Sequence, residues 1–391
     1  MTSTSTAVRP VESVGSAAVA RALPAWVYNH PALTPIEYER IIKPSWQIVC
    51  HVSSLARAGD YVTLDLGADS VIAVRTSRGD IQTLHNVCRH RGARILEGAG
   101  HCPGAITCPY HGWSYRLSGE LLAITARETF PAALDKTQLG LKSVRSEIWN
   151  GFVFVCLAGN TRPLAEIWAG VADEFAPHRF AEMQPLGPAY LEHWDCDWKV
   201  AMDNYLESYH VPIGHPGLNR MFTPDYDDQV NFPGVARGIS WLREQPSPRW
   251  SERLYQKLAV EVSAALPEAH RRRWSFTSML PNLGIDVFPD QMDFFQVLPR
   301  GAGKCMIRGQ SFALPDERRE MRIARYLSAR INRQVQREDE FLCRRVQQGL
   351  ASGSYEPGPL SRLENCMFEF HEQLRERIPE LREKSPPARF S

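Results

Sequence analysis

Cys88-Arg89-His90 and, after a gap of seventeen residues, Cys108-Pro109-Tyr110-His111 form the stretch that decides the fold of this chain. Each of the two pairs offers one thiolate and one imidazole to a metal. Glycines such as Gly92, Gly104 and Gly112 interrupt the chain around both pairs, which predicts loops rather than the interior of helices or strands. Two loops with matched cysteine and histidine ligands indicate a metal centre.

Two kinds of metal centre take two cysteines and two histidines. Zinc fingers place their cysteines together and their histidines together along the chain, whereas here each cysteine is followed by its own histidine. In a Rieske [2Fe–2S] centre histidines replace two cysteines on one iron, which raises the reduction potential. Residues 44–155 resemble Rieske proteins, and the resemblance implies that Cys88, His90, Cys108 and His111 hold a one-electron cluster.

The type of Rieske protein follows from two missing cysteines. Respiratory Rieske proteins carry an additional cysteine in each loop, and the corresponding positions here are Ala93 and Tyr110. The chain is therefore more similar to the lower-potential ferredoxins and oxygenases. A free-standing ferredoxin would end near residue 155, so electron transfer alone leaves most of the chain without a role.

The remaining sequence predicts two folded regions and an N-terminal segment. Short aromatic and β-branched runs, such as Tyr61–Leu64 and Phe152–Val155, predict an all-β domain over 44–155. Residues 156–391 mix helical and strand-like segments and predict an α+β domain. Residues 1–43 are expected to pack on that domain, with a loose tail at their start. Helices are expected around residues 165–175, 198–210, 252–265 and 316–350, and a capping box from Ser361 to Glu364 opens a last helix.

The overall composition is that of a globular protein with no charged partner. The formal net charge of +1 gives no reason to expect nucleic acid or an anionic membrane. The longest apolar run is far shorter than the roughly 20 residues that span a bilayer. Nine scattered cysteines do not form the pattern of a secreted disulfide framework. We therefore expect a cytoplasmic protein without a membrane partner.

A second metal site is indicated by the segment from Asp203 to His215. A helix through this segment would place Asp203, Glu207 and His210 on one face. Pro212 and Gly214 would then end the helix, so that His215 turns back towards His210. Non-haem Fe(II) oxygenases bind iron with two histidines and one carboxylate, and leave the opposite side open.

The third ligand is expected from the long helix after Pro315. Its apolar residues recur every four positions at Ile323, Leu327, Ile331 and Val335, and the next position is Asp339. A carboxylate on the buried side of a helix is costly unless it is paired or bound to a metal. Asp339 is therefore the predicted ligand, with Asp316 and Glu340 as the next candidates.

With both sites in view, the chain resembles the α subunits of Rieske non-haem iron oxygenases over nearly its whole length. The resemblance implies a catalytic domain with a helix-grip-like antiparallel sheet, iron held by His210, His215 and Asp339, and a head-to-tail homotrimer. It also implies that Glu207 connects the cluster of one subunit to the iron of the next. A separate NAD(P)H-dependent flavin and iron–sulfur reductase would supply the electrons.

The substrate is open to two interpretations. With Glu at position 207, the chain resembles the subgroup that oxidises quaternary ammonium compounds, such as carnitine, glycine betaine and stachydrine. In that case Tyr205, Tyr209, Trp241, Phe288, Phe294 and Phe295 could surround the cation. Arginines in 237–273 could instead meet the carboxylate of an aromatic acid, the substrate of a ring-hydroxylating mono- or dioxygenase. For the function as a whole, a non-enzymatic Rieske electron carrier remains a further alternative.

Overall fold

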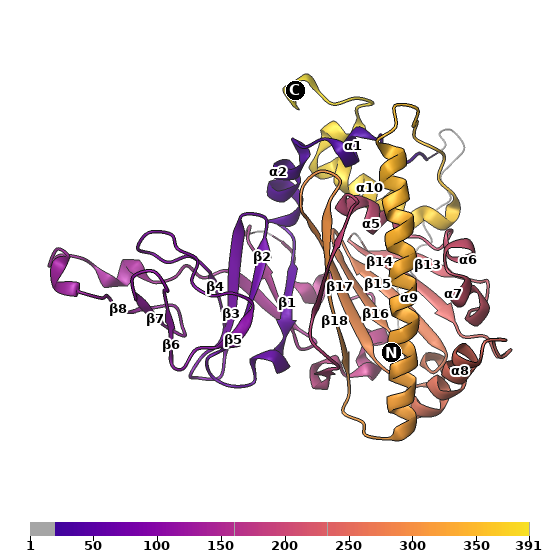
Figure 1. Ribbon diagram of the computed structural model, residues 1–391, viewed down its shortest axis with the longest axis horizontal. Coiled ribbons are helices and arrows are strands. Elements are labelled where there is room, and N and C mark those ends of the chain that lie inside the picture. The colour runs from indigo at the N-terminus through magenta and orange to yellow at the C-terminus, as the bar shows by residue number, and fades with distance from the viewer. Residues whose placement is uncertain (1–19, 160, 233, 391) are drawn as a thin grey trace, which may run out of the picture.

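The computed structural model describes residues 20–159, 161–232 and 234–390, and it contains a small all-β domain beside a larger α+β domain (Figure 1). The small domain runs from β1 (Gln47–His51) to β10 (Phe152–Cys156). This confirms the expected fold class. The expected loose tail falls largely on residues 1–19, which lie outside the described residues.

Within the described residues, three antiparallel sheets make up the small domain. β10 pairs with β1 and with β9, and so joins the two ends of the domain. The second sheet has the order β4-β3-β2-β5, and the third has the order β6-β7-β8. The remaining strands of the domain are β2 (Asp60–Leu66), β3 (Asp69–Arg75), β4 (Ile81–His85), β5 (Ala99–His101), β6 (Ala105–Thr107), β7 (Ser114–Arg116), β8 (Leu121–Ala123) and β9 (Arg145–Trp149).

The larger domain is built on an antiparallel sheet that, within the described ranges, has eight strands. From β13 to β18 the strands lie side by side in chain order, and β11 and β12 pair with β18. Its strands are β11 (Gln184–Pro185), β12 (Tyr190–Trp194), β13 (Asp227–Phe232), β14 (Val235–Trp241), β15 (Arg273–Met279), β16 (Leu283–Val287), β17 (Met292–Pro299) and β18 (Cys305–Ala313).

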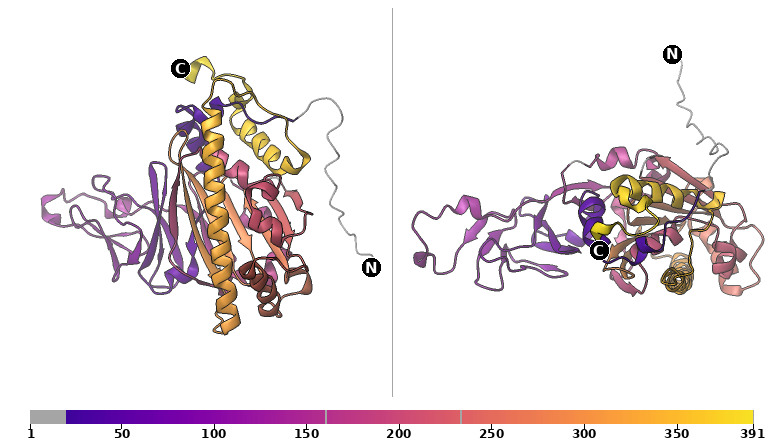
Figure 2. Two further views of the ribbon diagram at one scale, coloured as in Figure 1. Left: turned by 45° about the vertical axis from the view of Figure 1, so that its right-hand side comes forward. Right: turned by 90° about the horizontal axis from the view of Figure 1, so that it is seen from above.

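The two faces of this sheet meet different partners because side chains alternate along a strand. Ile285, Met292 and Phe294 point into a core shared with Phe152 and Phe154 of β10, and this core joins the domains. The long helix α9 (Arg319–Leu350) crosses the other face, and Figure 2 shows it end-on as a separate layer. The functional residues of the larger domain lie between α9 and the sheet.

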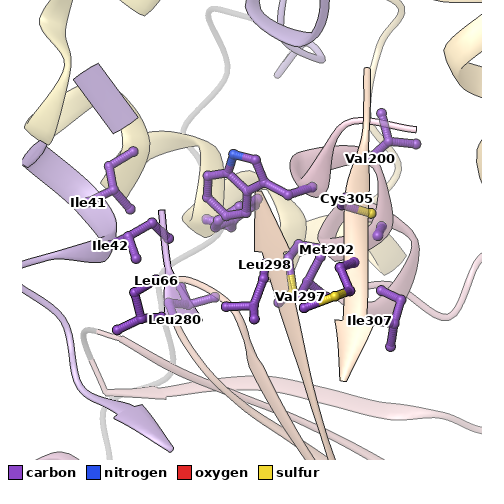
Figure 3. Close-up of a cluster of buried hydrophobic side chains, with 14 of the residues drawn as sticks. Ile41, Ile42, Leu66, Val200, Met202, Leu280, Val297, Leu298, Cys305 and Ile307 are labelled. Atoms are coloured by element: carbon purple, nitrogen blue, oxygen red, sulfur yellow. The ribbon is translucent and has the colours of Figure 1, made fainter. Parts of the chain in front are cut away.

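The segment before β1 is packed into the largest core. Ile41 and Ile42 contact a cluster that includes Leu66 of β2 and Val297 of β17 (Figure 3). Glu37, also from this segment, accepts hydrogen bonds from Trp198 and Lys199 at the start of α5 (Trp198–Tyr205). The segment thus ties the sheet of the small domain to α5 of the larger one.

The predicted helices are confirmed in part. The helix expected around 316–350 is α9, and the one expected around 252–265 is α8 (Trp250–Val262). The stretch around 165–175 forms only two single turns, α3 (Leu164–Ile167) and α4 (Ala172–Phe175), separated by residues 168–171. The capping box at Ser361 is present, and α10 (Asn365–Arg377) follows it. None of the helices in the described ranges is long and apolar enough to cross a membrane.

Candidate metal centres

The two Cys-His loops of the small domain have the same backbone geometry. The amide of Cys88 donates to the carbonyl of Ala93, and the amide of Cys108 donates to the carbonyl of Trp113, five residues on in both cases. Gly92 and Gly112 each lie four residues after the cysteine and have φ of +74° and +72°, a conformation that favours glycine. Both loops therefore turn back on themselves and present their ligands to a common space.

The side chains of these loops fit an iron–sulfur cluster. Both cysteines are free and almost fully buried, at 3% and 2% exposure. The rings of His90 and His111 lie 4.6 Å apart, and His90 stacks on Trp113. Nδ1 of His90 is buried and, among the described residues, has no hydrogen-bond partner. A buried nitrogen beside two thiols is satisfied when it coordinates a metal.

A tyrosine not singled out from the sequence supports one cysteine. The hydroxyl of Tyr115, on β7, lies 3.2 Å from Sγ of Cys88 and accepts a hydrogen bond from the amide of Arg89. Tyr115 is fully buried. A hydroxyl that donates to a cluster sulfur stabilises the reduced, more negative state, so this contact tunes the reduction potential.

The expected helix over 198–210 is wrong in its second half. α5 ends at Tyr205, and Glu207 lies in the turn that follows it. Pro212 does not end a helix here but opens one, because proline fits the first turn, where its missing N–H is not needed. His210 and His215 therefore precede the short helices α6 (Val211–Gly214) and α7 (Pro216–Met221).

Despite this different route, the two histidines meet each other and the predicted aspartate. The Nε2 atoms of His210 and His215 are 3.1 Å apart, and Oδ1 of Asp339 lies 3.6 Å from the first and 3.0 Å from the second. Ligand atoms bonded to one metal at about 2.1 Å and at right angles lie about 3.0 Å apart. The three atoms therefore have the spacing of a facial triad.

Two glutamates orient the histidines. Oε1 of Glu207 lies 2.5 Å from Nδ1 of His210, and Oε2 of Glu338 lies 2.9 Å from Nδ1 of His215. A carboxylate on Nδ1 fixes the tautomer in which Nε2 carries a free lone pair. Burial disfavours the charged form of His215, yet Asp339 and Glu338 outweigh it and raise the pKa of this imidazole. The three carboxylates around the histidines thus give the site a negative electrostatic potential, which suits a cation.

Other acidic residues near the site have different partners. Asp203 lies outside the triad and accepts hydrogen bonds from Tyr28 and His371. The alternatives to Asp339 are both paired elsewhere, Asp316 with Arg318 and Glu340 with Arg344.

Asn204 and Glu338 are functional candidates that the sequence analysis missed. The amide of Asn204 donates to Asp339 at 2.7 Å. In the sequence, the signal for Asn204 and Glu338 was that each lies directly beside a residue already singled out, Asp203 and Asp339 respectively.

A cavity of about 640 Å³ opens next to the triad, between α9 and the sheet. This volume is typical of a site for a small ligand. Of the aromatic residues proposed from the sequence, Tyr205 and Phe295 line the cavity; Phe294 borders it too, but its ring packs in the core on the other face of the sheet. Tyr209 is 60% exposed at the surface, and Phe288 belongs to a core with Trp274, so neither matches the expectation.

The fold and the sites together define a class of protein. A cysteine–histidine cluster site in a β domain is joined to a two-histidine, one-carboxylate site beside a ligand cavity. The first can pass single electrons, and the second leaves coordination positions open for O₂. This combination defines a Rieske-type oxygenase.

Comparison with known families identifies the chain more closely. Residues 180–380, just over half of the chain, match the family described as ring hydroxylating alpha subunit (catalytic domain), and residues 45–142 match the Rieske [2Fe-2S] domain. The chain therefore belongs to the α subunits of the Rieske oxygenases. Such enzymes hold a Rieske cluster and a mononuclear iron, and they act with a reductase on a small substrate and O₂.

Several relatives share most of the length of the chain. It is 28% identical to the chloroplastic choline monooxygenase of Arabidopsis thaliana, covering 88% of this chain and 80% of that one. It is also 28% identical to the glycine betaine monooxygenase oxygenase subunit of Chromohalobacter salexigens, with coverages of 87% and 82%. A solved structure of a quaternary ammonium Rieske monooxygenase has the same fold, with a TM-score of 0.78, 22% identity, and coverages of 92% and 96%.

Proposed function

We propose that this chain is the terminal oxygenase of a multicomponent system that hydroxylates a quaternary ammonium or betaine-type compound. In this proposal His210, His215 and Asp339 hold the mononuclear iron, and Cys88, His90, Cys108 and His111 hold the cluster. The corresponding domains span residues 44–155 and 156–391, with residues 1–43 as the N-terminal segment. Bound in these sites, the cluster supplies single electrons and the iron activates O₂ beside the substrate.

The observation that carries the substrate class is the charge of the cavity. Its walls include the carboxylates of Asp228, Asp286 and Asp293 together with aromatic rings, a surface that suits a cation and disfavours an anionic aromatic acid. The printed names of several relatives, choline, glycine betaine and carnitine monooxygenases, support the same class. Arg237, from the range proposed to meet an aromatic acid, also lines this cavity, but it is paired with Glu174 and Asp227.

The overall reaction requires two electrons from the reductase. One atom of O₂ is inserted into a C–H bond of the substrate, and the other leaves as water with two protons. When the carbon is an N-methyl group, the product is an N-hydroxymethyl cation. Its C–N bond then breaks, the electron pair stays on nitrogen, and formaldehyde and a proton are released. The protein contributes by positioning the substrate and by holding the iron ligands, since the metal supplies the difficult chemistry.

Electron delivery is proposed to occur between subunits of a homotrimer. Figure 1 shows the sheet β6-β7-β8, which follows one cluster loop, at the end of the molecule remote from α9. Glu207 already contacts one iron histidine, because its two oxygens bind Nδ1 and the amide of His210. A cluster histidine of a neighbouring subunit could approach the same carboxylate, which would then connect the two centres.

A formaldehyde-release screen tests the substrate class. The purified chain, a surrogate reductase and NADH are incubated with betaines, choline, methylamines and aromatic acids, and formaldehyde and other hydroxylated products are quantified. Oxidation of one or more quaternary ammonium compounds is expected. Oxidation restricted to aromatic acids would contradict the proposal and favour the ring-hydroxylating alternative.

The role of Glu207 is tested with Glu207→Gln. Glutamine keeps the length of the side chain but removes its charge, so both metals should remain bound while electron delivery slows. Cluster oxidation in a single turnover with the reduced protein is the measurement. Glu340→Gln on α9 is the control, because Glu340 pairs with Arg344 near the surface and, among the described residues, contacts no metal ligand. An unchanged rate of cluster oxidation in Glu207→Gln would contradict the bridging role.

A further inference from the structure

Three aspartates lie in one row across the catalytic sheet. The strand register aligns Asp228 with Gly238, Gly238 with Phe276, Phe276 with Asp286, and Asp286 with Asp293. These residues belong to neighbouring strands and project from the same face, towards α9. All of them line the cavity beside the metal triad. Asp286 and Asp293 lie on the two strands of one hairpin, whereas Asp228 comes from a distant segment of the chain.

Asp286 and Asp293 are an unfavourable pair unless something compensates them. Like charges placed directly opposite each other on adjacent strands are destabilising. Among the described residues neither carboxylate forms an ion pair, and the charges of Asp293 and Asp339 raise the pKa of Asp286, while that of Asp290 raises the pKa of Asp293. Burial raises the pKa of Asp286 to about 8 and that of Asp293 to about 7. The pair thus retains part of its negative charge at neutral pH, and no ion pair from the described part of the chain neutralises it.

The two arginines that also line the cavity do not neutralise the pair. Arg237 is engaged with Glu174, at 3.0 Å, and with Asp227, at 3.5 Å. Arg333 of α9 is exposed, and its Nε donates to the carbonyl of Ala329. The cavity therefore has an acidic wall that its own basic residues leave uncompensated.

Hydrogen bonds hold the two carboxylates in place without neutralising them. Tyr205 donates to Asp286 at 2.7 Å. Asp293 accepts from Gln291 at 2.9 Å and from Asn332 of α9 at 3.4 Å. These donors are uncharged, so they fix the direction of the carboxylates and leave their charge available to a ligand.

The next row of the sheet aligns Ser278, Gly284 and Phe295, and it supplies an aromatic ring and a free hydroxyl. A Cβ at Gly284 would lie 2.3 Å from the ring of Phe295, so glycine allows this ring to lie over the sheet. The ring of Tyr205 meets that of Phe295 edge to face, at 4.5 Å. Ser278 lines the same cavity at 1% exposure, and its hydroxyl has no partner among the described residues. An unpaired buried hydroxyl indicates a polar ligand group.

We infer that Asp286 and Asp293, with the aromatic faces of Tyr205 and Phe295, form the subsite that binds the cationic nitrogen of the substrate. This inference rests on the proposed function and deepens it, since it assigns the cation to named residues. The carboxylates supply charge, and the rings supply an apolar surface that tolerates N-methyl groups. The hydroxyl of Ser278 is placed to bind a polar substituent of the same molecule.

The experiment measures binding, so it does not depend on turnover. Dissociation constants are determined by calorimetry on the oxidised, metal-loaded protein without reductase, for choline and for its neutral isostere 3,3-dimethylbutan-1-ol. The two ligands have the same shape and differ in charge. In the wild-type protein choline should bind at least about tenfold more tightly, the effect of one opposite charge within a few ångströms. Asp286→Asn together with Asp293→Asn should reduce this preference to near unity.

Asparagine at both positions keeps the size of the side chain and can still accept the hydrogen bond from Tyr205. The matched control is Asp290→Asn. Asp290 is also buried and accepts a hydrogen bond from a tyrosine, Tyr255 at 2.9 Å, and it lies in the turn before β17, outside the lining of the cavity. The Asp290→Asn substitution should leave the preference for choline over its isostere unchanged. Cluster absorbance and far-UV circular dichroism verify that each variant is folded.

Each outcome decides one statement. A folded double variant that keeps the wild-type preference overturns the subsite, and so does a wild-type protein with no preference for choline over the isostere. If the chain oxidises a quaternary ammonium compound but the double variant binds choline normally, the proposed function stands and the subsite fails. If the chain oxidises only aromatic acids, the proposed function fails, and the ratio of the two dissociation constants still tests the subsite.

Discussion

The two candidate metal centres are built in different ways. The cluster ligands lie within one stretch, from Cys88 to His111, on two loops with the same backbone hydrogen bonds. The triad combines two histidines near the end of α5 with Asp339 from the middle of α9. The first site depends on local turns, and the second depends on how α9 packs across the sheet. Local sites leave a pattern in the sequence, whereas sites built from distant segments leave only fragments.

The strongest test of this comparison removes one ligand from each centre. His215→Ala should abolish oxygenation and lower the iron content from about three to about two per chain, while the cluster spectrum persists. Cys108→Ser should remove the cluster and leave about one iron. Anaerobic metal analysis and visible absorbance are the measurements. Loss of all iron in either variant would show that the two centres are not independent.

The next test concerns the residue that orients a ligand. Glu338→Gln weakens the hold on Nδ1 of His215, and we expect mononuclear iron to bind about 10 to 100 times more weakly. Iron affinity is measured by competition with a chelator. Glu340→Gln, two positions further along α9, is the control and should bind iron normally. Equal affinities in the two variants would remove Glu338 from the site.

A smaller effect is expected at the cluster. Tyr115→Phe removes the hydroxyl that reaches Sγ of Cys88 and should make the reduction potential more negative, on the order of tens of millivolts. A redox titration followed by visible absorbance measures the shift. The iron content should not change, since no ligand is removed. An unaltered potential would mean that the hydroxyl does not donate to the sulfur.

The smallest expected effect is the pH dependence of cation binding. Asp286 and Asp293 have raised pKa values of about 8 and about 7, and a cation binds their ionised forms. Affinity for choline should therefore increase as the pH rises from about 6 to about 9, and it should decrease as these groups become protonated. The double asparagine variant should show a flat profile. A rise that persists in this variant would assign the titration to other groups.

Particular residues show where prediction from the sequence succeeds. Cys88, His90, Cys108 and His111 were identifiable because spacing and turn residues are local properties. Asp339 was identifiable because it interrupts a four-residue apolar repeat, and the structure brings it to the histidines. The helix through Glu207 was predicted too long, since periodicity does not distinguish a proline that ends a helix from one that begins the next. The prediction that His210 and His215 meet did not depend on this helix, because the two residues are close along the chain in either case.

The sequence by itself determined the kind of chemistry, because ligand type and local spacing are enough to specify an iron–sulfur site and a histidine pair. Only the tertiary structure decided what surrounds them. The placement of Glu338 on Nδ1 of His215 depends on the packing of α9. The row of aspartates depends on strand register, which aligns Asp286 with Asp293 across a hairpin and brings Asp228 into line from a distant segment. Strand register sets which side chains share a face, and between strands that are far apart in sequence no local turn fixes it. Substrate recognition is therefore a property of the fold.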